Sequence, residues 1–107
     1  MRFDNCFDFA KSDIALGPLD GRYRSQVAAL TNYLSEPALN RARLLVEVEW
    51  LIFLAENQVL TGVSPFNEDE KRYLRALVAS FGSEEVSELK RIEAETRHDV
   101  KAVEYFL

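Results

Sequence analysis

The hydrophobic residues of the chain recur mostly at the three- and four-residue spacing of amphipathic helices, and no segment alternates convincingly as a strand would. The strongest pattern covers residues 38–57, where apolar residues surround most of the helix. We expect this helix to be buried on most sides, inside a bundle or a subunit interface. Ser35 is the expected N-cap, with Pro37 in the first turn and Asn57 near the end. The expected apolar stripe consists of Leu39, Ala42, Val46, Trp50, Phe53 and Leu54, and it is widened by Leu45, Val48, Leu51 and Ile52.

The segment before this helix is less regular. Residues 1–15 show no sustained period, so we expect an irregular N-terminal arm. The arm is expected to dock through its phenylalanines, Phe3, Phe7 and Phe9. GPLDG at 17–21 is typical of a turn, because it combines two glycines and a proline, and a short helix is expected over 22–34. The predicted organisation is therefore an arm followed by one helical domain over 16–107.

Further helices are predicted toward the C-terminus. Asn67 and Glu70 have the spacing of a capping box, Gly82 is expected to stop that helix, and Ser83 begins the next. Asp99 is the expected cap of a last helix. The apolar faces of these helices are predicted to contain Tyr73, Leu74, Leu77, Val78, Phe81, Val86, Leu89, Ile92, Val100, Val103, Phe106 and Leu107. The fold class is therefore all-α.

Composition narrows the class of protein. The 107 residues allow one domain, and the net charge of −5 argues against general nucleic-acid binding. The lone Cys6 excludes an intrachain disulfide framework, and no signal peptide is expected, because residues 1–16 lack its apolar stretch and its small-residue cleavage site. The longest apolar run, Trp50–Ala55, is too short to cross a membrane, so a cytoplasmic protein is expected. The last apolar face ends on an apparently exposed Phe106-Leu107 pair without a stop signal, and we therefore expect a piece of a longer polypeptide, truncated within that helix.

Two polar clusters are candidates for chemistry. Arg22 and Tyr23 follow a glycine turn at a predicted helix start, where a guanidinium, a phenol and free amides suit a phosphate or a carboxylate. Arg97, His98 and Asp99 lie at a predicted helix junction, and His98 is the only histidine. An ordinary turn and a solvated helix junction remain the alternative interpretations of these two clusters.

Other chemistry has little support. Glu47 and Glu49 are expected to lie on the solvent-exposed face of their helix or to pair with Arg43. The sequence contains no P-loop, no dinucleotide fingerprint, no metal-ligand spacing and no nucleophile elbow. No metal and no cofactor are therefore expected.

Three segments together resemble the N-terminal region of adenylosuccinate lyase, a family of the fumarase/aspartase superfamily. They are PLDGRYRSQVAAL (18–30), RLLVEVEWL (43–51) and RIEAETRHDVKAVEYFL (91–107), in the order and at the separation typical of that family. The resemblance implies a small helical N-terminal domain without the long central helical bundle. It also implies a homotetramer when the protein is complete, and a reaction that eliminates fumarate from adenylosuccinate to give AMP, and from the succinylated imidazole-carboxamide ribotide, without a cofactor.

The same resemblance implies roles for the two clusters. Arg22 and Tyr23 would grip the nucleotide phosphate, and Arg97, His98 and Asp99 would line the same pocket. His98 would bond the phosphate, position the substrate and assist the acid–base step, whereas Asp99 would orient its neighbours. The family's catalytic Ser-Ser-x-Met-Pro loop and its general-acid Thr-His segment do not occur in these 107 residues. The chain is therefore expected to be inactive by itself.

Two other function classes remain open at this point. The chain could be a free-standing helical interaction module, whose exposed apolar helices dock a partner. It could also resemble another superfamily member, such as argininosuccinate lyase or a fumarase-type enzyme. The DGRY segment (20–23) argues against the latter, because a phosphate grip has no use for a substrate without a phosphate.

Overall fold

The computed structural model describes residues 15–107 and divides the chain after Thr31 into two compact units. All regular structure between residues 15 and 107 is helical, which confirms the predicted all-α class. Within this part of the chain no helix combines the length and the apolar character that a membrane span requires. The predicted arm, with Phe3, Cys6, Phe7 and Phe9, lies outside the described residues up to residue 14.

The segment predicted as one helix over 22–34 forms three short helical pieces. They are α1 (Arg24–Val27), the 3-10 turn η1 (Ala28–Leu30) and α2 (Thr31–Leu34), which crosses the boundary between the units. The tightened turn is closed by the Thr31 hydroxyl, which donates to the carbonyl of Ala28 at 2.7 Å. None of the three pieces buries a residue, so no tertiary packing enforces a continuous helix.

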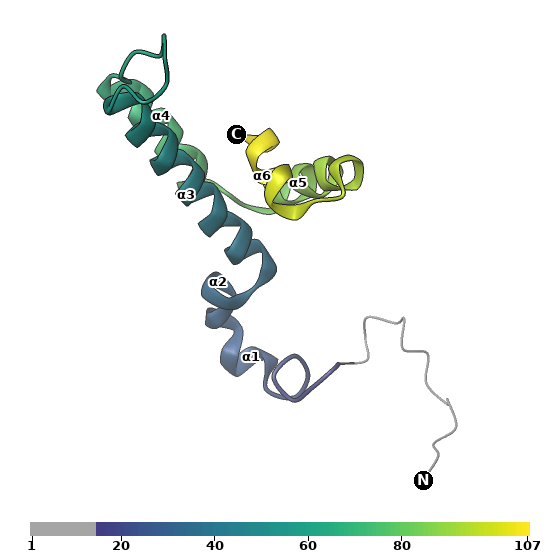
Figure 1. Ribbon diagram of the computed structural model, residues 1–107. Helices are drawn as coiled ribbons and strands as arrows, with labels where there is room; N and C mark the ends of the chain where they lie inside the picture. The colour runs from purple at the N-terminus through teal and green to yellow at the C-terminus, as the bar shows by residue number, and fades with distance from the viewer. Residues whose placement is uncertain (1–14) are drawn as a thin grey trace. The chain divides into compact units, whose positions relative to one another are not determined.

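The second unit is built on the long helix α3 (Glu36–Glu56; Figure 1). The hydroxyl of Ser35 accepts the amide of Ala38 at 3.2 Å, which confirms the predicted N-cap. The helix ends at Asn57, as predicted, and Gln58 turns the chain away with a φ of 55°. Local capping chemistry thus fixes both ends of α3.

The buried face of α3 matches the predicted stripe only in part: Val48 and Ile52, which were expected to widen the stripe, are buried. The core-facing residues are Leu44, Val48, Ile52 and Ala55, all between 0% and 3% exposed. Four large members of the predicted stripe are between 49% and 66% exposed: Leu39, Val46, Trp50 and Phe53. Two faces of α3 carry apolar residues at helical spacing, and the neighbouring helices cover only the Leu44 face. Within this unit α3 is therefore buried on one side, and burial of its other face in a subunit interface stays a prediction.

Three shorter helices cover that face. They are α4 (Glu68–Ala79), α5 (Ser83–Thr96) and α6 (Asp99–Phe106). The helix α4 runs beside α3 (Figure 1), and α6 packs on both α3 and α5. Leu89, Ala102 and Val103 complete the buried cluster. The rings of Phe81 and Phe106 meet edge to face at 6.0 Å between their centres.

Several local predictions can now be compared with these helices. The capping box of Asn67 and Glu70 is confirmed, whereas α4 already ends at Ala79, and Gly82 is the N-cap of α5 rather than a stop. Tyr73 is 67% exposed, so its place on the apolar face is wrong. Phe106 packs against the core with Leu107, so the expectation of an exposed apolar pair is also wrong.

A fork of two hydrogen bonds joins α3 to α4. Arg75 donates from Nε and Nη2 to the two carboxylate oxygens of Glu49, at 2.7 and 3.0 Å. These bonds lower the pKa of Glu49 below its ordinary range. The partner of Glu49 is therefore Arg75 and not Arg43, which pairs elsewhere.

This ion pair predicts a stability that depends on pH. The pKa of Glu49 is lower in the folded than in the unfolded chain. The ion pair therefore stabilises the fold at a pH above the ordinary glutamate pKa, and this stabilisation is lost as the pH falls through the lowered pKa of the folded chain. Urea unfolding at pH 7 and at about pH 3.5 measures how much the free energy of unfolding decreases in acid. This decrease should be smaller for Glu49→Gln than for the wild type, by up to about 1 kcal/mol. Glu47→Gln, on the same helix, is the control, and its free energy of unfolding should decrease in acid as much as that of the wild type. Equal decreases in all three proteins would contradict the prediction.

Candidate functional site

The α5–α6 junction consists of two residues with unusual backbone geometry. Arg97 closes α5 in the left-handed region, with φ 53° and ψ 31°, and its amide donates to the carbonyl of Glu93 at 2.7 Å. His98 then adopts an extended conformation and is the N-cap of α6. The prediction that Asp99 caps this helix is therefore wrong, because Asp99 is its first residue. This sharp change of direction leaves the side chains of Arg97 and His98 exposed.

The cap determines which nitrogen of His98 carries its proton. Nδ1 of the imidazole accepts the backbone amide of Lys101 at 3.1 Å. An accepting Nδ1 requires the neutral tautomer with hydrogen on Nε2. The side chain is 64% exposed, so the Nε2–H group is a donor available to a ligand. The hydroxyl of Thr96 also bonds the His98 carbonyl at 3.2 Å, which ties the junction to the last turn of α5.

The carboxylate of Asp99 is engaged by its own helix and by α3. Its Oδ1 accepts the amide of Val100 at 2.9 Å, and its Oδ2 lies 2.9 Å from Nη1 of Arg43. These two contacts, the Val100 amide first, lower the pKa of Asp99. A carboxylate held in this way suits a role in orienting neighbours better than direct contact with an anion.

The turn before Arg22 and Tyr23 is built by the other two residues of the DGRY segment. The carboxylate of Asp20 accepts the amides of Gly17 and Leu16 at 2.7 and 3.0 Å, which lowers its pKa. A Cβ on Gly21 would come within 2.9 Å of the Ala15 side chain. Glycine is therefore required at position 21, because the turn leaves no room there for a side chain.

Arg22 and Tyr23 provide side chains for a ligand rather than free backbone amides at a helix N-terminus. The helix α1 has only four residues, and the amide of Tyr23 already donates to the carbonyl of Pro18 at 2.8 Å. The expectation of free amides at a helix N-terminus is therefore wrong for Tyr23. The Arg22 guanidinium lies 5.4 Å from the centre of the Tyr23 ring, in cation–π geometry. Among residues 15–107 no carboxylate forms an ion pair with Arg22 or Arg97, so both cations can meet an anionic ligand.

The structure brings together one of the two clusters. Arg97, His98 and Asp99 are contiguous in the second unit, whereas Arg22 and Tyr23 belong to the first. Convergence of the two clusters on one phosphate therefore stays a prediction. Residues 15–107 contain no group of side chains arranged to hold a metal ion.

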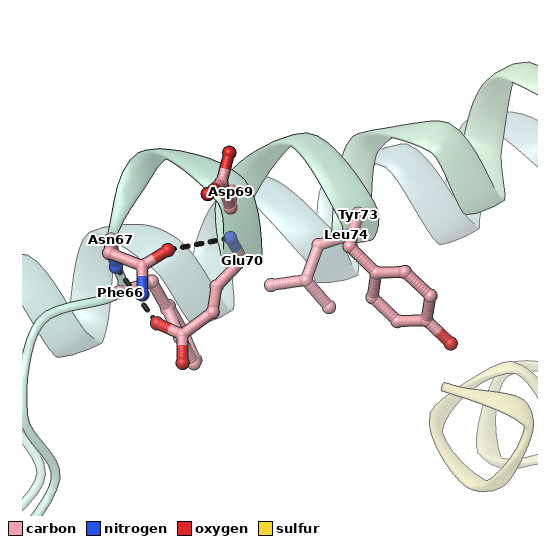
Figure 2. Close-up of a pocket in the computed structure, with 6 residues that line it drawn as sticks. All are labelled: Phe66, Asn67, Asp69, Glu70, Tyr73 and Leu74. Atoms are coloured by element: carbon pink, nitrogen blue, oxygen red, sulfur yellow. Dashed lines mark hydrogen bonds between the residues drawn. The ribbon is translucent and has the colours of Figure 1, made fainter.

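A cavity of about 430 Å³ at the start of α4 is a weaker candidate (Figure 2). Its polar groups include Asn67 and Glu70, whose side chains accept each other's backbone amides at 2.9 and 2.8 Å. These atoms already cap the helix. The cavity therefore has a structural explanation and no set of convergent donors.

Sequence reasoning missed two residues beside the His98 site. Arg43 pairs with Asp99, and its Nη1 also donates to the side-chain oxygen of Asn40 at 3.3 Å. Asn40 is 8% exposed, and it is the buried polar residue among those described. An amide side chain within a helix whose other buried residues are apolar was the available signal, but the sequence does not indicate that Arg43 beside it pairs with Asp99 on another helix.

The fold and motifs define the class of this protein as an all-α chain, with exposed arginine, tyrosine and histidine side chains at helix ends. No family model matches the chain. Curated relatives named adenylosuccinate lyase are 48% identical over 93 residues in Escherichia coli, 46% in Haemophilus influenzae and, over 94 residues, 42% in Dictyostelium discoideum. Each match covers 87% of this chain and 20% of the relative.

The resemblance seen in the motifs is thereby confirmed. This chain is similar to one part of adenylosuccinate lyase, and it spans about one fifth of the length of the relatives it matches. The homology extends over most of the residues described above, since only 13% of the chain lies outside the match.

The cap at His98 predicts different effects for two substitutions. His98→Ala removes the acceptor for the Lys101 amide and should destabilise the chain by about 0.5–2 kcal/mol. His98→Asn should retain most of the stability, because asparagine is a good N-cap. Urea unfolding of both variants measures the difference. Equal stability of His98→Ala and the wild type would show that the imidazole does not cap α6.

Proposed function

We propose that this chain is the N-terminal, substrate-binding part of an adenylosuccinate lyase of purine nucleotide biosynthesis. The observation that carries the proposal is 48% identity to such an enzyme over 93 residues. The all-α fold supports it, as do Arg22 and Arg97, which form no ion pair with another residue between 15 and 107. We further propose a cytoplasmic homotetramer that uses no cofactor.

The reaction defines what these side chains have to do. A general base removes a proton from the carbon next to a carboxylate of the succinyl group, and the bond from carbon to the purine amino nitrogen breaks. A general acid protonates that nitrogen, so adenylosuccinate yields AMP and fumarate. The same elimination applies to the succinylated imidazole-carboxamide ribotide. The chain carries no segment matching the serine loop or the Thr-His segment that supply these proton transfers, so it is expected to bind and not to turn over.

The side chains of the two clusters suit the phosphate end of the substrate. Arg22 supplies a guanidinium fork, Tyr23 a hydroxyl and His98 an Nε2–H donor. Arg97 adds a second cation beside His98. Asp99 is engaged by Arg43 and therefore orients the junction instead of repelling the phosphate. His98 also stands close enough to the bound substrate, in this proposal, to assist the acid–base step.

The alternative of a helical interaction module has one observation in its favour. The exposed face of α3 carries Trp50 stacked on Phe53 at 5.5 Å, together with Leu39 and Val46. Such a face normally meets a partner. A homotetrameric lyase accounts for this face as well, and it also accounts for the sequence similarity, which an unrelated module does not.

Loss of Arg22 should mainly weaken nucleotide binding. In a complete lyase that contains this sequence, Arg22→Ala should reduce the affinity for AMP by about 2–4 kcal/mol, because a charge-assisted phosphate contact is removed. Isothermal titration with AMP measures this change. Arg24→Ala, two residues further along the same segment, is the control and should bind nearly normally. Unchanged affinity in Arg22→Ala would show that Arg22 is only a turn residue.

Loss of the imidazole should damage turnover without damaging the fold. His98→Asn keeps an N-cap for α6 but removes the Nε2–H donor, so kcat/KM of the complete enzyme should fall by about 10²-fold or more. Steady-state assays of fumarate release measure this rate, and urea unfolding checks the fold. A nearly normal rate in His98→Asn would remove His98 from the site.

A further inference from the structure

Arg43 connects the long helix to the candidate site. Its Nη1 lies 2.9 Å from Oδ2 of Asp99 at the start of α6. The Arg43 side chain is 27% exposed and the Asp99 side chain 53%, so the pair lies partly shielded at the edge of the α3–α6 packing. Arg43 is therefore fixed on the helix that carries the core, and its charge reaches the residue next to His98.

A second contact holds the guanidinium in place. The same Nη1 donates to the side-chain oxygen of Asn40, one turn earlier on α3, at 3.3 Å. A guanidinium nitrogen carries two hydrogens in a fixed plane, so one nitrogen can serve both acceptors. The buried Asn40 thus aims the charge of Arg43 at Asp99.

The Asp99 carboxylate also faces the imidazole. Its Oδ1 lies 3.9 Å from Nδ1 of His98, the atom that accepts the Lys101 amide. An unneutralised carboxylate at this place favours the neutral tautomer that carries its hydrogen on Nδ1, in which the cap is lost and Nε2 has no hydrogen. A cation on the other carboxylate oxygen opposes this preference.

We propose that Arg43 is a positioning residue of the site: it neutralises Asp99, so that His98 keeps Nδ1 on the Lys101 amide and presents Nε2–H to the substrate phosphate. The inference rests on the proposed function only for the identity of the ligand. The tautomer of His98 is a property of the chain without ligand, so it can be tested separately.

The test measures the two His98 nitrogens in the full chain by long-range ¹H–¹⁵N NMR at about pH 8, where an ordinary imidazole is neutral. The ratio of Nε2–H to Nδ1–H tautomers should fall about two- to fivefold in Arg43→Gln, as expected for loss of a partly exposed ion pair. Arg43→Lys keeps the charge and should restore most of the ratio. Arg72→Gln, which breaks the exposed pair with Asp69 on α4, is the control and should leave the ratio unchanged.

A double substitution separates this role from a merely structural one. In the Asp99→Asn background no carboxylate attracts the proton, so adding Arg43→Gln should leave the tautomer ratio unchanged. An unaltered ratio in Arg43→Gln alone, or an equal fall with and without Asp99, would overturn the inference. If the ratio responds as expected while His98→Asn leaves turnover normal, the positioning role stands and the proposed function fails at His98.

Discussion

The packing of α6 against α3 is the constraint on which the candidate site of the second unit depends. Ala102 and Val103 of α6 are buried against the Leu44 face of α3, so the start of α6 is fixed relative to the long helix. The left-handed Arg97 and the extended His98 make the change of direction that this packing requires. The His98 imidazole and the Arg97 guanidinium are exposed because the chain turns at this point.

In both candidate clusters some residues build the local backbone, and their neighbours are left with side chains exposed for a ligand. In the DGRY segment, Asp20 and Gly21 build the turn, and Arg22 and Tyr23 are left with exposed side chains. At the α5–α6 junction, Asp99 is engaged by the fold, and Arg97 and His98 are left exposed. In both places a carboxylate organises the backbone beside a cation or a donor, which is an arrangement suited to binding an anion.

The sequence predicted features that depend on neighbouring residues. The caps at Ser35 and at Asn67 with Glu70 were predictable, because a side chain meets an amide three residues away. The buried face of α3 was not, because Leu39, Val46 and Trp50 have helical spacing as good as that of Leu44 and Val48. Only the packing of α4 and α6 selects the face. The pairing of Arg43 with Asp99 was missed for the same reason, since Glu47 is nearer in sequence.

The proposed function requires Arg22 and His98 to bind the same phosphate, and a crystal structure of a complete lyase containing this sequence, with AMP bound, tests this proposal most directly. The account predicts phosphate oxygens within about 3 Å of both the Arg22 guanidinium and Nε2 of His98. A bound AMP whose phosphate touches neither residue, or only one of them, would contradict it.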